Sequence, residues 1–264
     1  MGILNLTPDS FHDGGAWDKP AAALGQAECM LDEGADVLDL GAQSTRPGAD
    51  LLGAEAEWQR LEPVLVALKR AHPDAIVSVD TFHAEVARRA LAEGADVIND
   101  VSGGDADPDM WKVVAQARAP YVLMHMQGTP ATMQGNPTYD DVVHDVVTHL
   151  QRRVHAAYQA GVTDVIADVG FGFGKTVAHN YALLDALDQF QELRCPILAG
   201  VSRKSMIQKV LDTDSQHALN GTTALHAWAL DRGAHILRAH DVAEAKEVVA
   251  LHSALVQSRT PDAP

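Results

Sequence analysis

Eight short apolar runs along this chain each end in a polar residue that is unusual in a protein core. The ends carry carboxylates, amides, hydroxyls, imidazoles and cations, which together can hydrogen-bond a heterocycle and neutralise an anion. If the runs are parallel strands of one barrel, their ends meet at one mouth, where a (β/α)₈ barrel builds its active site. The polar ends are Asn5, Asp39, Asp80, Asn99 with Asp100, His125, Asp168, Ser202 with Lys204, and Arg238 with His240.

Two neighbouring ends suit a nitrogen-rich ring. Asp80 supplies a carboxylate and Asn99 an amide, a combination that can bind the N–H-rich edge of a pterin or purine. Asp80 can alternatively cap the helix that follows it, although Thr81 is equally able to do so.

Two further ends carry pairs of polar residues spaced two apart, which share a face if the strand continues. Ser202 and Lys204 can hold a ring carbonyl or an anion, and a basic helix start explains them equally well. Arg238 and His240 suit phosphate recognition, because arginine binds phosphate in a bidentate manner and histidine adds a donor. The alternative for Arg238 is an ion pair with Asp241.

A glycine-rich segment, DVGFGFGK, occupies positions 168–175. We expect its alternate glycines to let the backbone approach a flat ligand and its two phenylalanines to stack on that ligand. A plain glycine-rich turn is the alternative, and the spacing is not that of a dinucleotide-binding motif. The histidines show no zinc-ligand spacing. Asn5 can contact Mg²⁺ only if phosphate oxygens supply other ligands.

The segments between the apolar runs have helical periodicity, which predicts alternating strands and helices. Glycines 34, 94 and 233 begin similar Gly-Ala junctions and suit helix C-termini. We therefore expect a single (β/α)₈ TIM barrel over 1–264, with 260–264 as a loose tail, and a doubly wound sheet as the structural alternative. The helical segments are 21–31, 54–68, 86–91, 142–158, 183–190 and 243–255, and long loops at 7–19, 41–53 and 126–137 follow strands one, two and five.

The composition restricts the classes of partner. A chain of 264 residues suits one barrel, and the net charge of −16 argues against binding to nucleic acid or an anionic membrane. Only two cysteines, Cys29 and Cys195, are present, which favours a reducing compartment without disulfides. The sequence shows neither a long apolar span nor a signal peptide, so we expect a cytoplasmic protein.

In their order along the chain, these motifs resemble those of dihydropteroate synthases, the pterin-binding enzymes of folate biosynthesis. The ordered set covers almost the whole chain and is far more specific than any single motif. The motifs are MGILNLTPDSF (1–11), STRPGA (44–49), SVDT (78–81), IND (98–100), LMHMQG (123–128), GFGFGK (170–175), SRKS (202–205) and RAHD (238–241).

The resemblance implies a transferase that joins p-aminobenzoate to 6-hydroxymethyl-7,8-dihydropterin diphosphate, giving 7,8-dihydropteroate and diphosphate. It implies Mg²⁺ as cofactor, sulfonamide inhibition and a homodimer. Mg²⁺-assisted loss of diphosphate would leave a pterin cation, which the ionised Asp80 and Asp168 favour, before the amine attacks. The implied roles are: Asp80, Asn99, Asp168 and Lys204 on the pterin; Thr45, Arg238 and His240 on the diphosphate; Phe11, Thr45, Arg46, Pro47, Phe173 and Ser202 around p-aminobenzoate; Asn5 on Mg²⁺; and Asp80, Asp168, Lys204 and Arg238 as catalytic groups.

The sequence departs from the family pattern in three places. Val169 stands where the family has proline, which we expect to loosen the start of that loop. Ala42-Gln43 stands where the family has Gly-Glu, which removes a charge near Arg46. The family's N-terminal hairpin is absent from the printed sequence. Two alternatives stay open: a methyltetrahydrofolate–corrinoid methyltransferase, and a pterin-binding paralogue without catalysis.

Overall fold

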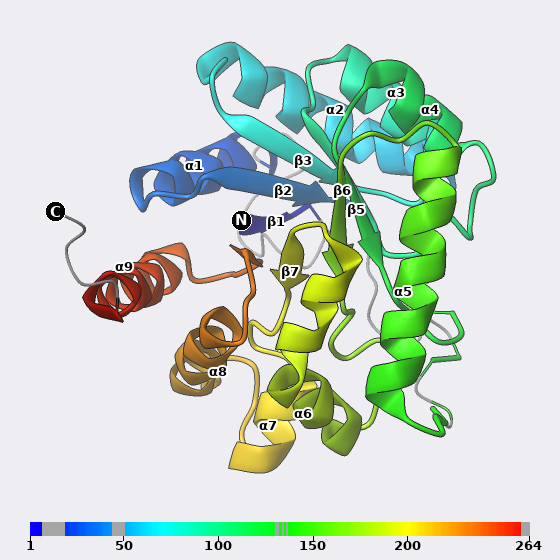
Figure 1. Cartoon of the computed structure of the whole chain (residues 1–264). Helices are drawn as coiled ribbons and strands as arrows, with labels where there is room; N and C mark the ends of the chain where they lie inside the picture. The colour runs from blue at the N-terminus through cyan, green and yellow to red at the C-terminus, as the bar shows by residue number, and fades with distance from the viewer. Residues whose placement is uncertain (7–18, 44–50, 130–131, 134, 136, 260–264) are drawn as a thin grey trace, which may run out of the picture.

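The strands form one parallel sheet in the order of the sequence (Figure 1). The computed structural model describes residues 1–6, 19–43, 51–129, 132–133, 135 and 137–259. The predicted tail at 260–264 therefore lies outside the described residues. The strands are β1 (Gly2–Asn5), β2 (Val37–Gly41), β3 (Ile76–Asp80), β4 (Val97–Asp100), β5 (Tyr121–Met124), β6 (Val165–Asp168), β7 (Ile197–Ala199) and β8 (Ile236–Leu237).

The sheet closes between its first and last strands. Gly2 pairs in parallel with Ala239, just beyond β8. The Ile3 amide donates to the Ala239 carbonyl over 2.9 Å, and the Ala239 amide donates to the Met1 carbonyl over 2.9 Å. Sequential strand order with closure confirms the (β/α)₈ barrel, and it excludes the doubly wound alternative, whose strand order reverses at a switch point.

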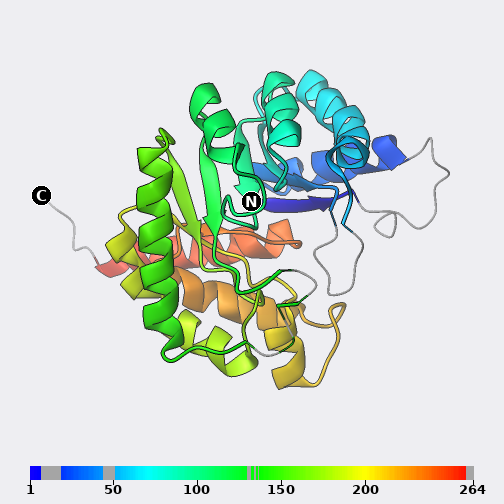
Figure 2. The same cartoon turned by 90° about the vertical axis from the view of Figure 1, so that its right-hand side faces the viewer.

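Helices surround the strands in both cartoon views (Figures 1 and 2). Segments with helical periodicity are helical, except that 183–190 is divided between an α-helix and a 3₁₀-helix. Three helices, α4, α7 and α8, were not predicted. The helices are α1 (Lys19–Asp32), α2 (Ala54–Ala71), α3 (Ala84–Ala92), α4 (Met110–Ala117), α5 (Val142–Gln159), α6 (Val177–Asp185), η2 (Leu187–Leu193), α7 (Ser205–Leu211), α8 (Leu219–Asp231) and α9 (Val242–Arg259).

The junction glycines take the conformation that a helix end requires. Gly34, Gly94 and Gly233 have φ of 93°, 96° and 93°, in the left-handed region where a Cβ is strained. The next strand can then begin within a few residues. No helix among the described residues is long and apolar enough to cross a lipid bilayer.

Alternation along the strands separates two apolar regions. Residues such as Leu38, Val77 and Ile98 pack outward in the large core shared with the helices. A smaller cluster fills the barrel interior, and it contains Val97, Val122 and Leu198 with Met1, Ile166 and Ile236 packed against it.

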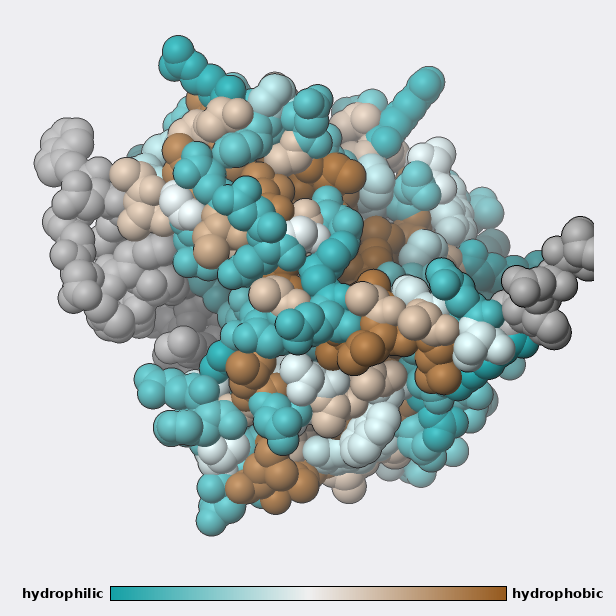
Figure 3. Space-filling model, turned by 90° about the vertical axis from the view of Figure 1, so that its left-hand side faces the viewer, coloured by the Kyte–Doolittle hydropathy of each residue, from teal (hydrophilic) through white to brown (hydrophobic). Residues whose placement is uncertain are grey.

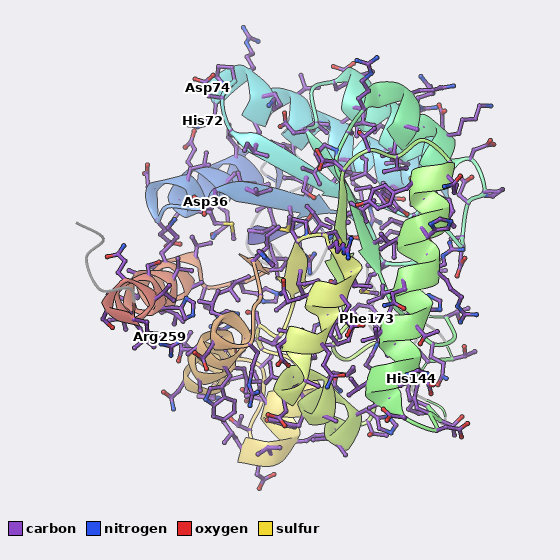
Figure 4. The ribbon with its side chains drawn as sticks, in the orientation of Figure 1. Asp36, His72, Asp74, His144, Phe173 and Arg259 are labelled. Atoms are coloured by element: carbon purple, nitrogen blue, oxygen red, sulfur yellow. The ribbon has the colours of Figure 1, made fainter. Side chains whose placement is uncertain are left out.

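The inward face of a strand changes from apolar to polar within two residues. Asn99, Asp168 and Arg238 each follow a member of the interior cluster by two positions, so they point to the same side of the sheet. The polar strand ends therefore lie directly next to this apolar cluster, on the same side of the sheet. Figure 4 shows Phe173 on the side of the barrel away from Asp36, His72 and Asp74, which precede β2 and β3.

Candidate active site

A cavity of about 630 Å³ opens at the carboxyl ends of the strands. It is lined by all the predicted site residues that the structure describes, which confirms that the barrel brings them together. The roles assigned to them remain predictions. The lining includes Asn5, Asp80, Asn99, Asp168, Phe173, Ser202, Lys204, Arg238 and His240. The other four, Phe11, Thr45, Arg46 and Pro47, lie outside the described residues.

Strand register sets Asp80 and Asn99 side by side. Gly41 of β2 aligns with Asp80 of β3, and Asp80 aligns with Asn99 of β4. A Cβ at Gly41 would lie 3.4 Å from the Asp80 Cβ, so the glycine leaves space beside the carboxylate. Asp80 does not cap the next helix. The Thr81 hydroxyl accepts from the His83 amide, and Asp107 accepts from the Ala84 amide at the start of α3.

A buried carboxylate beneath the cavity joins several strand ends. Asp39 is fully buried and accepts from Ser78 Oγ over 2.6 Å, from Asn99 Nδ2 over 3.0 Å and from Arg238 Nε over 2.6 Å. Asn99 and Arg238, which were assigned to different parts of the ligand, are thereby held by one group. Asp39 does not line the cavity, so it acts on a ligand only through its neighbours.

Arg238 pairs with carboxylates of the barrel interior, and not with Asp241 as the alternative proposed. Its Nη2 donates to Asp80 Oδ2 over 3.0 Å, in addition to the bond to Asp39. Although burial opposes it, the neighbouring Asp39 and Asp80 raise the pKa of Arg238, so the side chain stays charged. Asp241 instead forms a bidentate pair with Arg203, with distances of 2.8 and 2.6 Å.

The Asp80 carboxyl has a pKa above its ordinary value, because burial favours the neutral form more than Arg238 favours the charged one. The pKa of Asp168 is raised for the same reason, and the cation of Lys204 opposes that rise. The prediction that both carboxylates are ionised therefore depends on neighbouring cations and on pH.

Lys204 extends into the cavity beside Asp168. Its Nζ donates to the Phe171 carbonyl and lies 4.7 Å from the centre of the Phe173 ring. A Cβ at Gly200 would lie 3.8 Å from Lys204 Nζ and 4.0 Å from Asp168 Oδ2, so this glycine leaves room for both groups. Burial lowers the pKa of Lys204 to about 8, although Asp168 favours the charged form. The amine is therefore mostly protonated at neutral pH and loses its proton slightly above it.

None of the three glycines of the glycine-rich segment lines the cavity, although the sequence predicted that they would let the backbone approach a ligand. Gly170 has φ of +71°, and a Cβ there would lie 2.0 Å from the His125 carbonyl oxygen. At Gly174 the Cβ would lie 2.5 Å from the Gln127 carbonyl oxygen. These glycines fit the loop after β6 against the loop after β5. The expectation of two stacking faces was wrong for Phe171, which is fully buried, whereas Phe173 lines the cavity and its stacking stays a prediction.

Ser202 and His240 form a hydrogen-bonded pair across β7 and β8. Ser202 Oγ accepts from the His240 amide over 3.1 Å and lies 3.1 Å from His240 Nδ1. If the hydroxyl donates to Nδ1, the imidazole proton lies on Nε2, where it can donate to a ligand. Burial, together with Arg238, lowers the pKa of His240 to about 4, so His240 is a neutral donor at neutral pH.

Three polar strand ends do not line the cavity. Asp39 lies below it, Asp100 accepts from the Tyr121 hydroxyl over 2.7 Å, and His125 contacts Lys175. At the end of β5 the cavity is lined instead by Met124, which follows Val122 by two residues. The alternation of side chains along a strand would have identified Met124 as a residue that faces the cavity. Other lining residues that sequence reasoning missed are Ile3, Gln43, Val101, Gly200, Arg203, Gln208, Ser215 and Gln216.

The structure describes two of the places where the sequence departs from the family pattern, Val169 and Gln43, and both side chains make defined contacts. Val169 is fully buried in the outer core. Gln43 donates to the Leu52 carbonyl over 2.8 Å and accepts from the Leu52 amide over 3.1 Å, and its Nε2 lies 3.3 Å from Glu57. The amide at position 43 can therefore donate and accept at once, which an ionised carboxylate there cannot.

The donor set fits a magnesium ion only weakly. Asn5 offers one amide oxygen to the cavity, and among the described residues no hydrogen bond to this side chain is present. In the described part of the chain, no group of three or more His, Cys, Asp or Glu residues could hold a metal ion. Mg²⁺ prefers six oxygen ligands, so a ligand's phosphate oxygens and water would have to supply most of them.

Comparison with known proteins agrees with the fold and the cavity. The pattern of the pterin binding enzyme family matches residues 1–240. Dihydropteroate synthase from Haemophilus influenzae is 44% identical over 251 residues, which is 94% of this chain and 90% of that protein.

Two solved structures are also similar. Xanthomonas albilineans dihydropteroate synthase with 4-aminobenzoic acid has a TM-score of 0.92 and 42% identity, covering 99% of this chain and 93% of that one. Yersinia pestis dihydropteroate synthase in a sulfonamide drug complex has a TM-score of 0.91 and 39% identity, covering 98% and 93%. The chain thus belongs to the pterin binding enzyme family, among relatives that are dihydropteroate synthases.

Proposed function

We propose that this protein condenses 6-hydroxymethyl-7,8-dihydropterin diphosphate with p-aminobenzoate to 7,8-dihydropteroate and diphosphate in folate biosynthesis. The observation that carries this proposal is that one cavity is lined both by a pair of carboxylate and amide residues and by a pair of cationic and hydrogen-donating residues. The first set, Asp80 and Asn99, suits the ring, while Arg238 and His240 suit the diphosphate. The similarity to dihydropteroate synthases supports the same reaction.

The pterin would lie against the aligned ends of β3, β4 and β6. Asp80, Asn99 and Asp168 present acceptors and donors to its polar edge, and Lys204 can donate to a ring carbonyl. As the bond to the diphosphate breaks, positive charge develops on the pterin methylene. Asp80 and Asp168 in their ionised forms stabilise that charge, so they act as catalytic groups through electrostatics and not as nucleophiles.

The leaving diphosphate would lie toward β8. Arg238 stays charged and uses some of its five N–H groups on Asp39 and Asp80, which leaves others for phosphate oxygens. His240 adds a neutral donor, and Thr45 is proposed to add a hydroxyl. Asn5 would hold Mg²⁺ together with the diphosphate, and the ion would neutralise charge on the leaving group.

The p-aminobenzoate site is proposed between Phe173, Ser202 and the long loops after β1 and β2. Phe173 lies over Lys204 and lines the cavity, so its ring can cover a flat aromatic acid. Phe11, Thr45, Arg46 and Pro47 would complete this site, with Arg46 suited to the carboxylate. Closure over the bound substrates would keep water from the pterin cation.

The test is diphosphate release from the pterin substrate and Mg²⁺, with and without p-aminobenzoate. We expect diphosphate and 7,8-dihydropteroate to form in equal amounts when both substrates are present. A folded chain that binds the pterin but releases no diphosphate would overturn the proposal in favour of a non-catalytic binder. A methyltransferase would need no diphosphate-binding group such as Arg238 with His240, and it would turn over methyltetrahydrofolate instead.

We also propose that the protein is a homodimer. Helices α8 and α9 carry exposed apolar side chains, including Trp228, 54% exposed, and Leu251, 73% exposed. Figure 3 views this side of the molecule and shows hydrophobic residues interspersed with hydrophilic ones. Contiguous exposed apolar surface marks interfaces, and we propose that the side chains on these two neighbouring helices contribute to one. Light scattering should give the mass of a dimer, and Trp228→Glu should shift it toward the 28.2 kDa monomer.

We further propose that the protein acts in a reducing compartment, the cytoplasm. Its two cysteines, Cys29 and Cys195, are both free thiols, one exposed and one buried. Free thiols of this kind are typical of reducing surroundings.

A further inference from the structure

Lys175 is a buried amine outside the cavity lining. It ends the glycine-rich segment, is 3% exposed and is absent from the set of residues that line the cavity. Its Nζ lies 2.9 Å from His125 Nδ1, 3.3 Å from the His125 carbonyl, 2.9 Å from the Gly170 carbonyl and 3.0 Å from the Phe173 carbonyl. Burial lowers the pKa of Lys175 to about 7, although Asp168 favours the charged form. A buried cation is costly unless polar groups solvate it, and these acceptors supply that solvation to the protonated amine.

The acceptors belong to two different loops. His125 follows β5, while Gly170 and Phe173 follow β6. Burial, together with Lys175, lowers the pKa of His125 to about 2, so its ring is neutral and Nδ1 can accept a hydrogen bond. Lys175 therefore joins the two loops at the point where Gly170 already touches the His125 carbonyl.

Two hydrogen-bond routes lead from Lys175 to residues of the cavity. The Gly170 peptide accepts from Lys175 through its carbonyl, and the Gly170 amide donates to Asp168 Oδ1 over 2.7 Å. Phe173 accepts from Lys175 through its carbonyl, and its ring lies 4.7 Å from Lys204 Nζ. The Lys175 amine therefore hydrogen-bonds both the turn that orients the Asp168 carboxylate and the residue, Phe173, that covers Lys204.

We infer that Lys175 is a positioning residue for the condensation reaction. It holds Asp168 in the orientation that the pterin needs and holds Phe173 where it covers p-aminobenzoate. When it is protonated, Lys175 also places a positive charge near Asp168, which favours the ionised carboxylate. This inference rests on the proposed function, but its effect on pterin binding can be measured without turnover.

The test compares Lys175→Met, which keeps the length of the side chain and removes its donors, with Lys112→Met on the exposed side of α4. For Lys175→Met we expect the dissociation constant of the pterin substrate and the Michaelis constant for p-aminobenzoate to rise at least about tenfold. A tenfold rise is the size of effect expected from the loss of one or more charge-assisted hydrogen bonds. Lys112→Met should match the unaltered protein.

The pH profile separates positioning from a purely structural role. Asp168 faces the cations of Lys204, Arg238 and Lys175, while Lys175 faces His125, Asp168 and Lys204. Removing one cation raises the pKa of the Asp168 carboxyl, so the acid limb of kcat/KM in Lys175→Met should move to higher pH. A loss of activity that is equal at every pH and follows the folded fraction would overturn the inference.

Two further outcomes are decisive. If Lys175→Met does not fold, Lys175→Gln keeps an N–H donor without the charge, and it should bind the pterin more weakly than the unaltered protein while still shifting the acid limb. Unchanged pterin binding in either folded variant would contradict the positioning role. If the unaltered protein binds the pterin but forms no product, the proposed function fails, while the binding comparison still tests Lys175.

Discussion

Replacing Asp39 by asparagine tests how the strand ends are held together. Asp39 is fully buried and accepts hydrogen bonds from Ser78, Asn99 and Arg238. Asparagine has the same shape but only one acceptor oxygen, so its NH₂ group must face at least one of these donors. The substitution also removes one of the two carboxylates that pair with Arg238.

The magnitude follows from these contacts. Breaking a buried ion pair costs about 3–5 kcal/mol, because the remaining charge stays buried. Arg238 keeps its bond of 3.0 Å to Asp80, so we expect the lower end, about 3 kcal/mol. For a chain of this size that corresponds to a fall in Tm of about 6–12 °C. Because Asn99 and Arg238 lose a common anchor, kcat/KM should fall at least about tenfold.

Asp100→Asn is the matched control. Asp100 is fully buried too, and it accepts from Tyr121, Ser102 and Gly104, none of which lines the cavity. Urea unfolding should show both variants to be destabilised, whereas the Michaelis constant for the pterin substrate should rise only in Asp39→Asn. Equal effects of the two substitutions on that constant, or a stability loss below about 1 kcal/mol for Asp39→Asn, would refute the reasoning.

Three other outcomes are expected. Lys204→Ala should lower kcat/KM at least about a hundredfold without loss of folding, since it removes a charged donor inside the cavity; steady-state kinetics that match the unaltered protein would contradict the pterin role. The kcat/KM for the pterin substrate should fall at acid pH, because the raised pKa values of Asp80 and Asp168 let these carboxyls take up protons. It should also fall above about pH 8, because Lys204 loses its proton; a flat profile from about pH 5 to about pH 10 would show that none of these groups matters. Sulfonamides should inhibit in competition with p-aminobenzoate, as a sulfonamide complex of a relative suggests, and full activity at a saturating drug concentration would count against an ordinary p-aminobenzoate site.

Much of the barrel could be predicted because its strands end in a regular way. Each apolar run ends in a polar residue, so Asp80, Asn99, Asp168 and Arg238 could be assigned to one mouth from the sequence. Helix α8 was missed, because Asn220, Gly221, Thr222 and Thr223 interrupt its apolar periodicity. Packing against α9 and the barrel must stabilise it instead.

The contacts of buried polar groups could not be predicted from the sequence. Glycine at 170 and 174 indicates a close approach of backbone, but the pattern does not say that the partner is the loop after β5. Likewise, Asp39 was indistinguishable from the other polar strand ends, and its role depends on Asn99 and Arg238 reaching it from distant parts of the chain. Such long-range pairings arise only once the barrel closes.

The most direct measurement of the division of the cavity into a ring site and a diphosphate site is a pair of titrations. One uses 6-hydroxymethyl-7,8-dihydropterin, and the other uses its diphosphate ester with Mg²⁺. His240→Ala should weaken binding of the ester about 10- to 100-fold, as expected for one hydrogen bond to a charged group, and leave binding of the alcohol unchanged. Asn99→Ala should weaken both ligands. If His240→Ala weakens both ligands equally, or neither, the assignment of the strand ends to ring and diphosphate is wrong.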